Sequence, residues 1–133
     1  RGATHDGYDF GQTYIEVDLA TQHLYFYKDG KVIIDSPFVS GNVSKNYTTP
    51  PGLFELYYKQ KDRVLKGEDY ATPVKYWMPF VYGQGLHDAS WQSAFGGNRY
   101  KTGHGSHGCI NLPEDQAALI YNTIDGGYPI IIY

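Results

Sequence analysis

The sequence lacks several features that particular classes of protein require. It contains one cysteine, Cys109, so no disulfide can form within the chain. Its net charge is −3 at pH 7, and no cluster of lysine and arginine is dense enough to follow a phosphate backbone. We therefore do not expect a nucleic acid as a partner. No apolar run approaches the roughly 20 residues that a membrane-spanning helix needs.

Aromatic residues are abundant, and tyrosine accounts for most of them. The chain has 14 tyrosines, 6 phenylalanines and 2 tryptophans, together with 16 glycines and 7 prolines. Aromatic side chains favour pleated, half-buried surfaces, whereas glycine and proline favour turns. At 133 residues the chain is long enough for one core and too short for two of ordinary size. The composition thus predicts a single, mainly β domain.

The first residues are polar and do not begin with methionine. We expect this start to be a cut inside a longer protein, which would remove any targeting signal from the sequence. We interpret residues 1–13 as a residual linker and residues 14–133 as the folded domain.

Apolar alternation and turn residues divide the domain into strands and loops. The pair Asp29-Gly30 is a hairpin signal, because glycine tolerates a positive φ. We expect the polar residues 59–72 to form a loop or hairpin tip, and residues 88–104 to form a functional loop. The predicted strands are residues 14–18, 23–27, 32–40, 53–58, 75–82 and 128–133.

One helix is predicted near the C-terminus. Pro113, Glu114 and Asp115 place a proline and two acids in a first turn, where a fixed φ and negative charge suit a helix. An apolar stripe follows until Gly126 and Gly127 end it. The expected architecture is therefore a mainly β single domain with one short helix after the cysteine.

Cys109 lies in the run Ser-His-Gly-Cys-Ile-Asn at residues 106–111. A thiol must become a thiolate to attack a carbonyl, and a nearby imidazole is the usual base. Gly108 lets a substrate approach the backbone, and the amides of Gly108 and Cys109 are free to face a developing oxyanion. The positive end of the following helix would favour a thiolate. The alternative is a buried structural thiol, although the glycine and histidine neighbours argue against it.

Three of the five histidines, His87, His104 and His107, lie close to Cys109 in the sequence. Proximity alone favours His107 as the base. These three histidines and the cysteine are also donors that zinc accepts, but the spacing His-x2-His-x-Cys is not a common zinc pattern, so no metal site is expected. We interpret the other two histidines as surface residues; they are His5 and His23.

Six aromatic residues lie between the early strands and this run. As a group they are more typical of a core than of a cleft, and the sequence does not sort them. They are Tyr76, Trp77, Phe80, Tyr82, Trp91 and Tyr100.

The run at residues 106–111 resembles the signature of L,D-transpeptidase (YkuD-type) catalytic domains, which are bacterial cell-wall enzymes. A separate upstream histidine, His87 in Gly-Leu-His-Asp, also matches this family. Thr49 begins the run Thr-Pro-Pro-Gly-Leu-Phe, which is similar to the family's turn and strand, and Gln22 begins a similar run in the opening hairpin. The resemblance covers nearly the whole chain and implies a β-sandwich-like catalytic domain over residues 14–133.

The resemblance implies a role for most residues of the run. Cys109 is the nucleophile, and His87, not the adjacent His107, is the base that activates it. His107 and Ser106 support the site through hydrogen bonds. The amides near His107, Gly108 and Cys109 form the oxyanion hole.

Three further positions extend this pattern or depart from it. Asn111 matches a position that braces the loop or contacts the substrate. Asp88 stands where many members have glycine or serine, and it is a candidate for the substrate-binding region; either its carboxylate or a backbone carbonyl would orient the base. His104 has no place in the pattern, and we interpret it as a surface loop residue.

The implied reaction is a two-step acyl transfer. Cys109 attacks the carbonyl between the third residue of a peptidoglycan stem tetrapeptide and its terminal D-alanine. The thioester then passes to an amine of a neighbouring stem, which gives a 3→3 cross-link. No metal or organic cofactor is required, and carbapenem-type β-lactams should acylate the same thiol. The resemblance also implies a location outside the cytoplasmic membrane, at the cell wall, and a monomer is favoured.

Three alternatives stay open. An L,D-carboxypeptidase would use the same residues and pass the acyl group to water. A cell-wall-binding module without catalysis would fit the abundance of tyrosine and tryptophan. A metal-binding or metallohydrolase domain would be built from His87, His104, His107 and Cys109.

Overall fold

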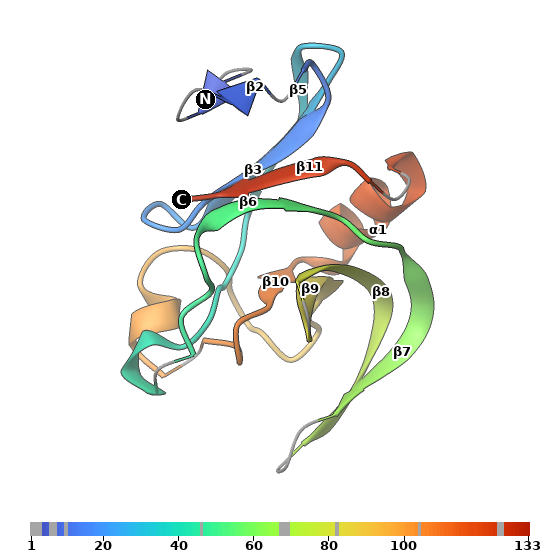
Figure 1. Ribbon diagram of the computed structural model, residues 1–133. Coiled ribbons are helices and arrows are strands. Elements are labelled where there is room, and N and C mark those ends of the chain that lie inside the picture. The colour runs from blue at the N-terminus through green and yellow to red at the C-terminus, as the bar shows by residue number, and fades with distance from the viewer. Residues whose placement is uncertain are drawn as a thin grey trace.

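Two mixed β-sheets and one helix surround a large hydrophobic core (Figure 1). The first sheet has the strand order β5-β4-β3-β11-β6, and the second has the order β10-β9-β8-β7. This arrangement confirms the predicted mainly β, sandwich-like fold. The computed structural model describes residues 4–5, 8–9, 11–45, 47–66, 70–81, 83–103, 105–124 and 127–133.

The elements are numbered along the chain. The strands of the first sheet are β3 (Tyr14–Asp18), β4 (His23–Lys28), β5 (Lys31–Pro37), β6 (Gly52–Glu55) and β11 (Pro129–Ile132). The strands of the second sheet are β7 (Gln60–Lys66), β8 (Ala71–Val81), β9 (Gln84–Asp88) and β10 (Ile110–Leu112). The helical elements are the 3-10 turns η1 (Val43–Lys45) and η2 (Arg99–Lys101) and the helix α1 (Glu114–Thr123).

A further pair of short strands, β1 (Thr4–His5) and β2 (Tyr8–Asp9), lies within the residues that we interpreted as a linker. The two strands are antiparallel. The domain boundary at residue 14 stays a prediction. No helix in the described part of the chain is long and apolar enough to cross a membrane.

The first sheet grows from the predicted meander β3-β4-β5. Asp29 and Gly30 have φ of 49° and 81°, the two positive values that a tight hairpin with right-handed strand twist requires. β11 lies between β3, to which it is parallel, and β6, to which it is antiparallel (Figure 1). The C-terminal strand is therefore an inner strand of this sheet, next to the edge strand β6. β5 ends at Pro37 and β6 at Glu55, both earlier than predicted.

The second sheet contains a strand that the sequence analysis missed. Residues 59–72 were predicted to form a loop or hairpin tip, but β7 runs from Gln60 to Lys66 and β8 starts at Ala71. The prediction was wrong for β7 because no residue of this strand is buried, so it has no apolar face to reveal it. β7 and β8 form a long hairpin that extends away from the core (Figure 1).

The core takes side chains from both sheets and from the helix. α1 follows the cysteine as predicted, and Ala117 and Ile120 are its buried residues. The helix stops at Thr123, short of the predicted glycines, because Ile124 is extended with φ −99° and ψ 159°. Lys59 donates to the carbonyl oxygens of Tyr121 and Ile124 at 2.7 Å each, and so satisfies the end of the helix. The core strand residues include Ile15, Val17, Leu24, Phe26, Met78, Phe80, Leu86, Ile110, Leu112 and Ile130.

The segment after β5 pairs through backbone hydrogen bonds with the cysteine-containing run, residues 106–111. Val39 and Asn111 exchange both backbone hydrogen bonds at 2.9 Å, and Ser106 N donates to Ser40 O at 2.9 Å. Asn42 N donates to Ser106 O at 2.8 Å. Val39 and Ser40, predicted to continue a strand of the first sheet, thus pair with the cysteine-containing run instead.

Thr49 fastens these two segments together. Its hydroxyl accepts a hydrogen bond from Gly41 N at 2.9 Å and donates one to Gly108 O at 2.8 Å. Gly41 has no room for a side chain, because a Cβ there would overlap the carbonyl oxygen of Tyr47. This buried hydroxyl therefore adds a side-chain link to the backbone bonds that hold the cysteine-containing run.

We expect Thr49→Val to destabilise the domain by about 2 kcal/mol or more, because it leaves the Gly41 amide and the Gly108 carbonyl buried without partners. Urea unfolding followed by circular dichroism measures this change. The matched control is Thr123→Val, which removes an exposed hydroxyl bonded to the Leu119 carbonyl within the helix; its effect should stay within about 0.5 kcal/mol. A loss no larger than the control's would show that the Thr49 hydroxyl does not hold this segment.

Candidate active site

The parallel pairing of β9 with β10 brings the candidate residues together. Leu86 lies opposite Ile110, and His87 lies opposite Asn111. Because side chains alternate across a strand, His87, Asn111 and Cys109 face one side of the sheet. Leu86 and Ile110 face the other side, where both are fully buried in the core. The histidine and the cysteine therefore share a site although they are distant in sequence.

Cys109 is a buried, neutral thiol. Only 8% of the residue is exposed, and Sγ lies 4.0 Å from the carbonyl oxygen of Gly83. Burial raises the pKa of the thiol to about 11, and a hydrogen bond from the Gly85 backbone opposes this shift only in part. No hydrogen bond joins the described side chains of Cys109 and His87.

The helix α1 begins too far from Cys109 to stabilise its thiolate. β10 separates Cys109 from the first helical residue, Glu114, and three strand residues span about 10 Å. The electrostatic effect of a helix end falls off within one turn. The raised pKa agrees with this separation, so the prediction that the helix favours a thiolate was wrong.

His87 is held as a neutral base. Its Nδ1 lies 2.7 Å from the carbonyl oxygen of Asp88, so Nδ1 carries the proton and Nε2 has a free lone pair. Burial lowers the pKa of His87, and the Asp88 carbonyl opposes this shift. The imidazole lies between two indole rings, with ring centroids 6.0 Å from Trp77 and 5.8 Å from Trp91.

The Asp88 carboxylate has a different partner from the one considered above. Its oxygens accept hydrogen bonds from the backbone amides of Lys75 at 2.9 and 3.2 Å and of Tyr76 at 2.8 Å. It thereby ties the end of β9 to β8. His87 is hydrogen-bonded to the backbone carbonyl of Asp88 and not to this carboxylate. Asp88 is a buried residue, with 4% of its surface exposed.

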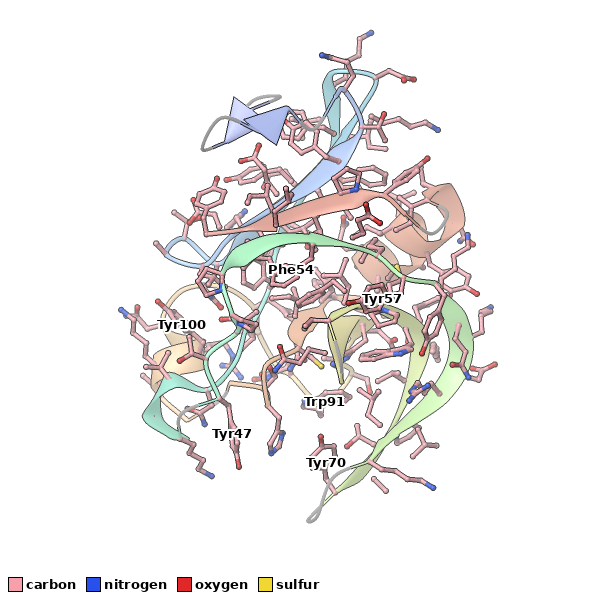
Figure 2. The ribbon with its side chains drawn as sticks, viewed as in Figure 1. Tyr47, Phe54, Tyr57, Tyr70, Trp91 and Tyr100 are labelled. Atoms are coloured by element: carbon pink, nitrogen blue, oxygen red, sulfur yellow. The ribbon has the colours of Figure 1, made fainter. Side chains whose placement is uncertain are left out.

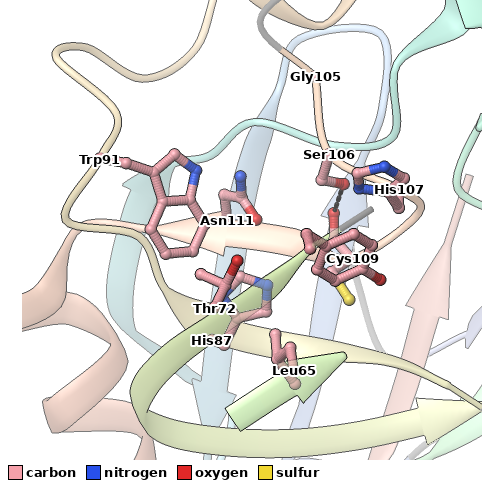
Figure 3. A pocket seen from close by; sticks show the side chains of 10 residues that line it. Leu65, Thr72, His87, Trp91, Gly105, Ser106, His107, Cys109 and Asn111 are labelled. Atoms are coloured by element: carbon pink, nitrogen blue, oxygen red, sulfur yellow. Dashed lines mark hydrogen bonds between the residues drawn. The ribbon is translucent and has the colours of Figure 1, made fainter. Parts of the chain in front are cut away.

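Ser106 shapes the turn before the cysteine. Its hydroxyl donates to the Cys109 carbonyl at 2.6 Å (Figure 3). It also accepts from the Gly108 amide at 3.1 Å. Gly108 has a φ of 120°, and a Cβ there would overlap the side-chain amide of Gln84. The Gly108 amide, expected to face an oxyanion, is thus bonded to Ser106 in this structure.

His107 is exposed and lies between two tyrosines. Its ring centroid is 4.6 Å from that of Tyr47 and 4.5 Å from that of Tyr70. Figure 2 shows both tyrosines at the same end of the molecule as Trp91. Burial and the nearby Cys109 raise the pKa of Tyr70. These contacts join the start of β8 to the loop that contains η1, across the cysteine-containing run.

One pocket contains both Cys109 and His87 (Figure 3). Three of its residues, Leu65, Tyr70 and Thr72, come from the β7–β8 hairpin. The sequence analysis missed them because it interpreted this hairpin as a loop, and no spacing signal connects them to the cysteine. The lining residues are Leu65, Tyr70, Thr72, His87, Trp91, Gly105, Ser106, His107, Cys109 and Asn111.

Asn111 lines this pocket with unused hydrogen-bonding capacity. It is 1% exposed, and neither Nδ2 nor Oδ1 has a partner among the described residues. A buried amide without partners is costly, and a peptide group entering the pocket has the donor and acceptor that would satisfy it.

The six aromatic residues that the sequence did not sort differ in position: some lie in the core and one lines the pocket. Trp77 and Phe80 are buried, Tyr76 packs against the core, and Trp91 lines the pocket. Tyr100 is half-buried in η2. Tyr82 lies outside the described residues, as does His104. Within the described part of the chain, no group of three or more His, Cys, Asp or Glu side chains could hold a metal ion.

Comparison with known proteins relates this geometry to one family. The model of the L,D-transpeptidase catalytic domain (YkuD) matches residues 12–132. L,D-transpeptidase 1 of Mycobacterium tuberculosis is 27% identical over 137 aligned positions, which cover 94% of this chain and 52% of that protein. The chain thus spans about half the length of the curated relatives that it matches.

Solved structures agree with the family model. The crystal structure of a cysteine-to-serine mutant of Enterococcus faecium L,D-transpeptidase has a TM-score of 0.87 and 42% identity, covering 92% of this chain and 50% of that one. The NMR structure of the E. faecium catalytic domain acylated by ertapenem has a TM-score of 0.80 and 43% identity, covering 92% and 97%. With a matching family model over most of its length, the chain belongs to the L,D-transpeptidase catalytic-domain family.

Proposed function

We propose that this chain is the catalytic domain of a peptidoglycan L,D-transpeptidase that forms 3→3 cross-links. The observation that carries the proposal is one pocket that contains a neutral thiol, Cys109, and a neutral imidazole, His87, with its Nε2 lone pair free. The E. faecium relative acylated by ertapenem supports acyl transfer to this thiol. The substrate places the reaction outside the cytoplasmic membrane, at the cell wall.

The first step forms a thioester. Sγ of Cys109 attacks the carbonyl carbon of the third residue of a stem tetrapeptide, and the thiol proton passes to Nε2 of His87. The tetrahedral intermediate then collapses, the bond from carbon to nitrogen breaks, and His87 gives the proton to the leaving amine of D-alanine. The protein is left with an acyl group on Cys109 and a neutral His87.

The second step transfers the acyl group. An amine of a neighbouring stem attacks the thioester carbon and loses a proton to His87 as the bond forms. The bond from carbon to sulfur breaks, and the proton returns to Cys109. The product is an amide between two third residues, with the thiol regenerated.

Burial explains why proton transfer accompanies attack. A raised thiol pKa and a lowered imidazole pKa both oppose a resting thiolate–imidazolium pair. The charged pair is therefore formed only when a substrate carbonyl receives the sulfur's electrons. His107 and Ser106 hold the turn that supplies the oxyanion hole. Because Ser106 already binds the Gly108 amide, the Cys109 amide is the better candidate to donate to the oxyanion.

Asn111 is the candidate for holding the donor peptide. Its unpaired amide lies on the same face as His87 and within the same pocket. One side chain of this kind offers both a donor and an acceptor to a peptide group. This contact would fix the carbonyl relative to the sulfur.

The first test is incubation of the chain with a stem tetrapeptide, followed by mass spectrometry of the peptides. We expect release of D-alanine and formation of a cross-linked dimer by the wild type, and neither by Cys109→Ala. His87→Gln should lower the rate by about 10²- to 10⁴-fold, the usual contribution of a general base. His23→Gln, which changes an exposed histidine paired with Asp35, is the matched control and should leave the rate unchanged.

The products also separate the alternatives. Shortened monomer without dimer would identify an L,D-carboxypeptidase that passes the acyl group to water. Peptide binding without any release of D-alanine would favour a cell-wall-binding module and contradict the proposal.

A carbapenem should acylate Cys109. We expect one adduct on the intact wild-type mass and none on Cys109→Ala, with slower adduct formation in His87→Gln because the proton acceptor is lost. Intact-protein mass spectrometry over time provides the measurement. An adduct that persists in Cys109→Ala would place the reactive group elsewhere.

The raised thiol pKa predicts the pH dependence of alkylation. Only the thiolate reacts, so the rate of alkylation by iodoacetamide in the folded protein should rise with pH until close to 11. The same chain unfolded in guanidinium chloride is the control, and its rate should level off above about 8.5. Circular dichroism at each pH ensures that the protein is folded. A rate that is already constant at pH 7 in the folded protein would mean a stabilised thiolate and contradict the neutral pair.

A further inference from the structure

A second pocket adjoins the pocket of Cys109. Trp91 and Gly105 line both of them. Figure 3 shows these two residues across the catalytic pocket from Leu65, which belongs to the β7–β8 hairpin. The other lining residues of the second pocket are Gln92, Ser93, Arg99 and Gly103.

Arg99 supplies the positive charge of this second pocket. Its Nη2 donates to Gln92 Oε1 at 3.1 Å and lies 3.5 Å from Ser93 Oγ. Its Nε is buried and has no hydrogen-bond partner among the described residues. The ion pairs found in the described part of the chain do not include Arg99. Arg99 is therefore a half-buried cation whose partners here are neutral.

The unpaired Nε of Arg99 is buried, so a carboxylate reaches it when the Arg99 side chain turns toward the second pocket. A guanidinium binds a carboxylate through two parallel N–H groups, and Nε with the neighbouring Nη2 forms such an edge. A carboxylate at this edge would satisfy Nε, whose burial without a partner is unfavourable, and would replace a weak contact of 3.5 Å with a charged one. Ser93 adds a hydroxyl donor at the same place.

The position of the pocket restricts the source of that carboxylate. A peptide whose carbonyl lies at Cys109 extends past Trp91 or Gly105 if it continues into the second pocket. A stem tetrapeptide carries a carboxylate on its terminal D-alanine, next to the bond that breaks, and can carry another on a side chain. Trp91, half exposed at 49%, offers an apolar surface between the two pockets.

We propose that Arg99 binds a carboxylate of the stem peptide whose carbonyl lies at Cys109. This inference rests on the proposed function, because it takes the stem peptide as the ligand. Arg99 would then select donor peptides by charge, while Cys109 and His87 perform the chemistry.

The test measures peptide binding to Cys109→Ala protein, in which recognition is separated from reaction. Calorimetric titration uses three peptides: the tetrapeptide, the tetrapeptide with a C-terminal amide, and the tetrapeptide with amidated side-chain carboxylates. We expect Arg99→Gln, added to Cys109→Ala, to weaken binding of the free tetrapeptide about tenfold or more. The effect should vanish for the peptide that lacks the carboxylate bound by Arg99.

The three peptides identify which carboxylate is bound. Loss of the Arg99 effect on terminal amidation assigns the D-alanine carboxylate, and loss on side-chain amidation assigns a side chain. An equal effect on all three peptides, no effect, or no binding of the tetrapeptide would overturn the proposal. The two proposals can fail separately. If the tetrapeptide binds in an Arg99-dependent way but the wild type releases no D-alanine, this inference is supported and the proposed function is wrong.

Two further variants separate charge recognition from folding. Arg99→Lys keeps the charge without the planar edge, so its affinity should lie between those of the wild type and Arg99→Gln. Lys101→Gln removes an exposed cation from the same turn, η2, and should leave binding unchanged. Equal thermal unfolding of all the variants would exclude misfolding as the cause of weaker binding.

Discussion

The parallel pairing of β10 with β9 is the constraint on which the site depends. It sets Asn111 opposite His87 and places Cys109 on the same face, while Leu86 and Ile110 anchor the opposite face in the core. β10 is only three residues long, too short to hold this register alone. The segment after β5 supports its other edge through the paired bonds of Val39 and Asn111. The register of the reacting groups is thus fixed by both neighbours of one short strand.

Burial of these groups has an electrostatic consequence. The same apolar environment that fixes Cys109 and His87 disfavours their charged forms, so the pKa of the thiol rises and that of the imidazole falls. The hydrogen bond that orients His87 in the described structure goes to the Asp88 carbonyl, which is a dipole and not a charge. Burial lowers the pKa of His87 and outweighs this carbonyl and the nearby Asp88 charge, which both favour imidazolium. The resting site is therefore neutral, and its reactivity depends on a bound substrate that accepts the developing charge.

The parts of the fold that the sequence predicted are those that carry a local signal. The Asp29-Gly30 turn, the strand β3 and the helix α1 are confirmed, because each is set by residues that enter the core or by a required backbone angle. β7 has no buried residue and so gave no alternation. The partners of His107 and of the Asp88 carboxylate are tertiary contacts that no spacing encodes. The run around Cys109 identified the family, but only the folded chain shows which group orients His87.

The reacting groups and the proposed recognition groups lie on different kinds of element. His87 and Asn111 project from paired strands, and Cys109 lies directly before one of them; backbone hydrogen bonds and the core fix the positions of these strands. Trp91 and Arg99 lie in the long connection between β9 and β10, which has no strand in its described residues and only the short turn η2. Because strands resist displacement and loops tolerate changes of sequence, such a division keeps the reacting atoms in register while the neighbouring loop determines which peptide reaches them. The half-buried guanidinium of Arg99 has the position, next to the catalytic pocket, and the unused donor that a recognition group of this kind requires.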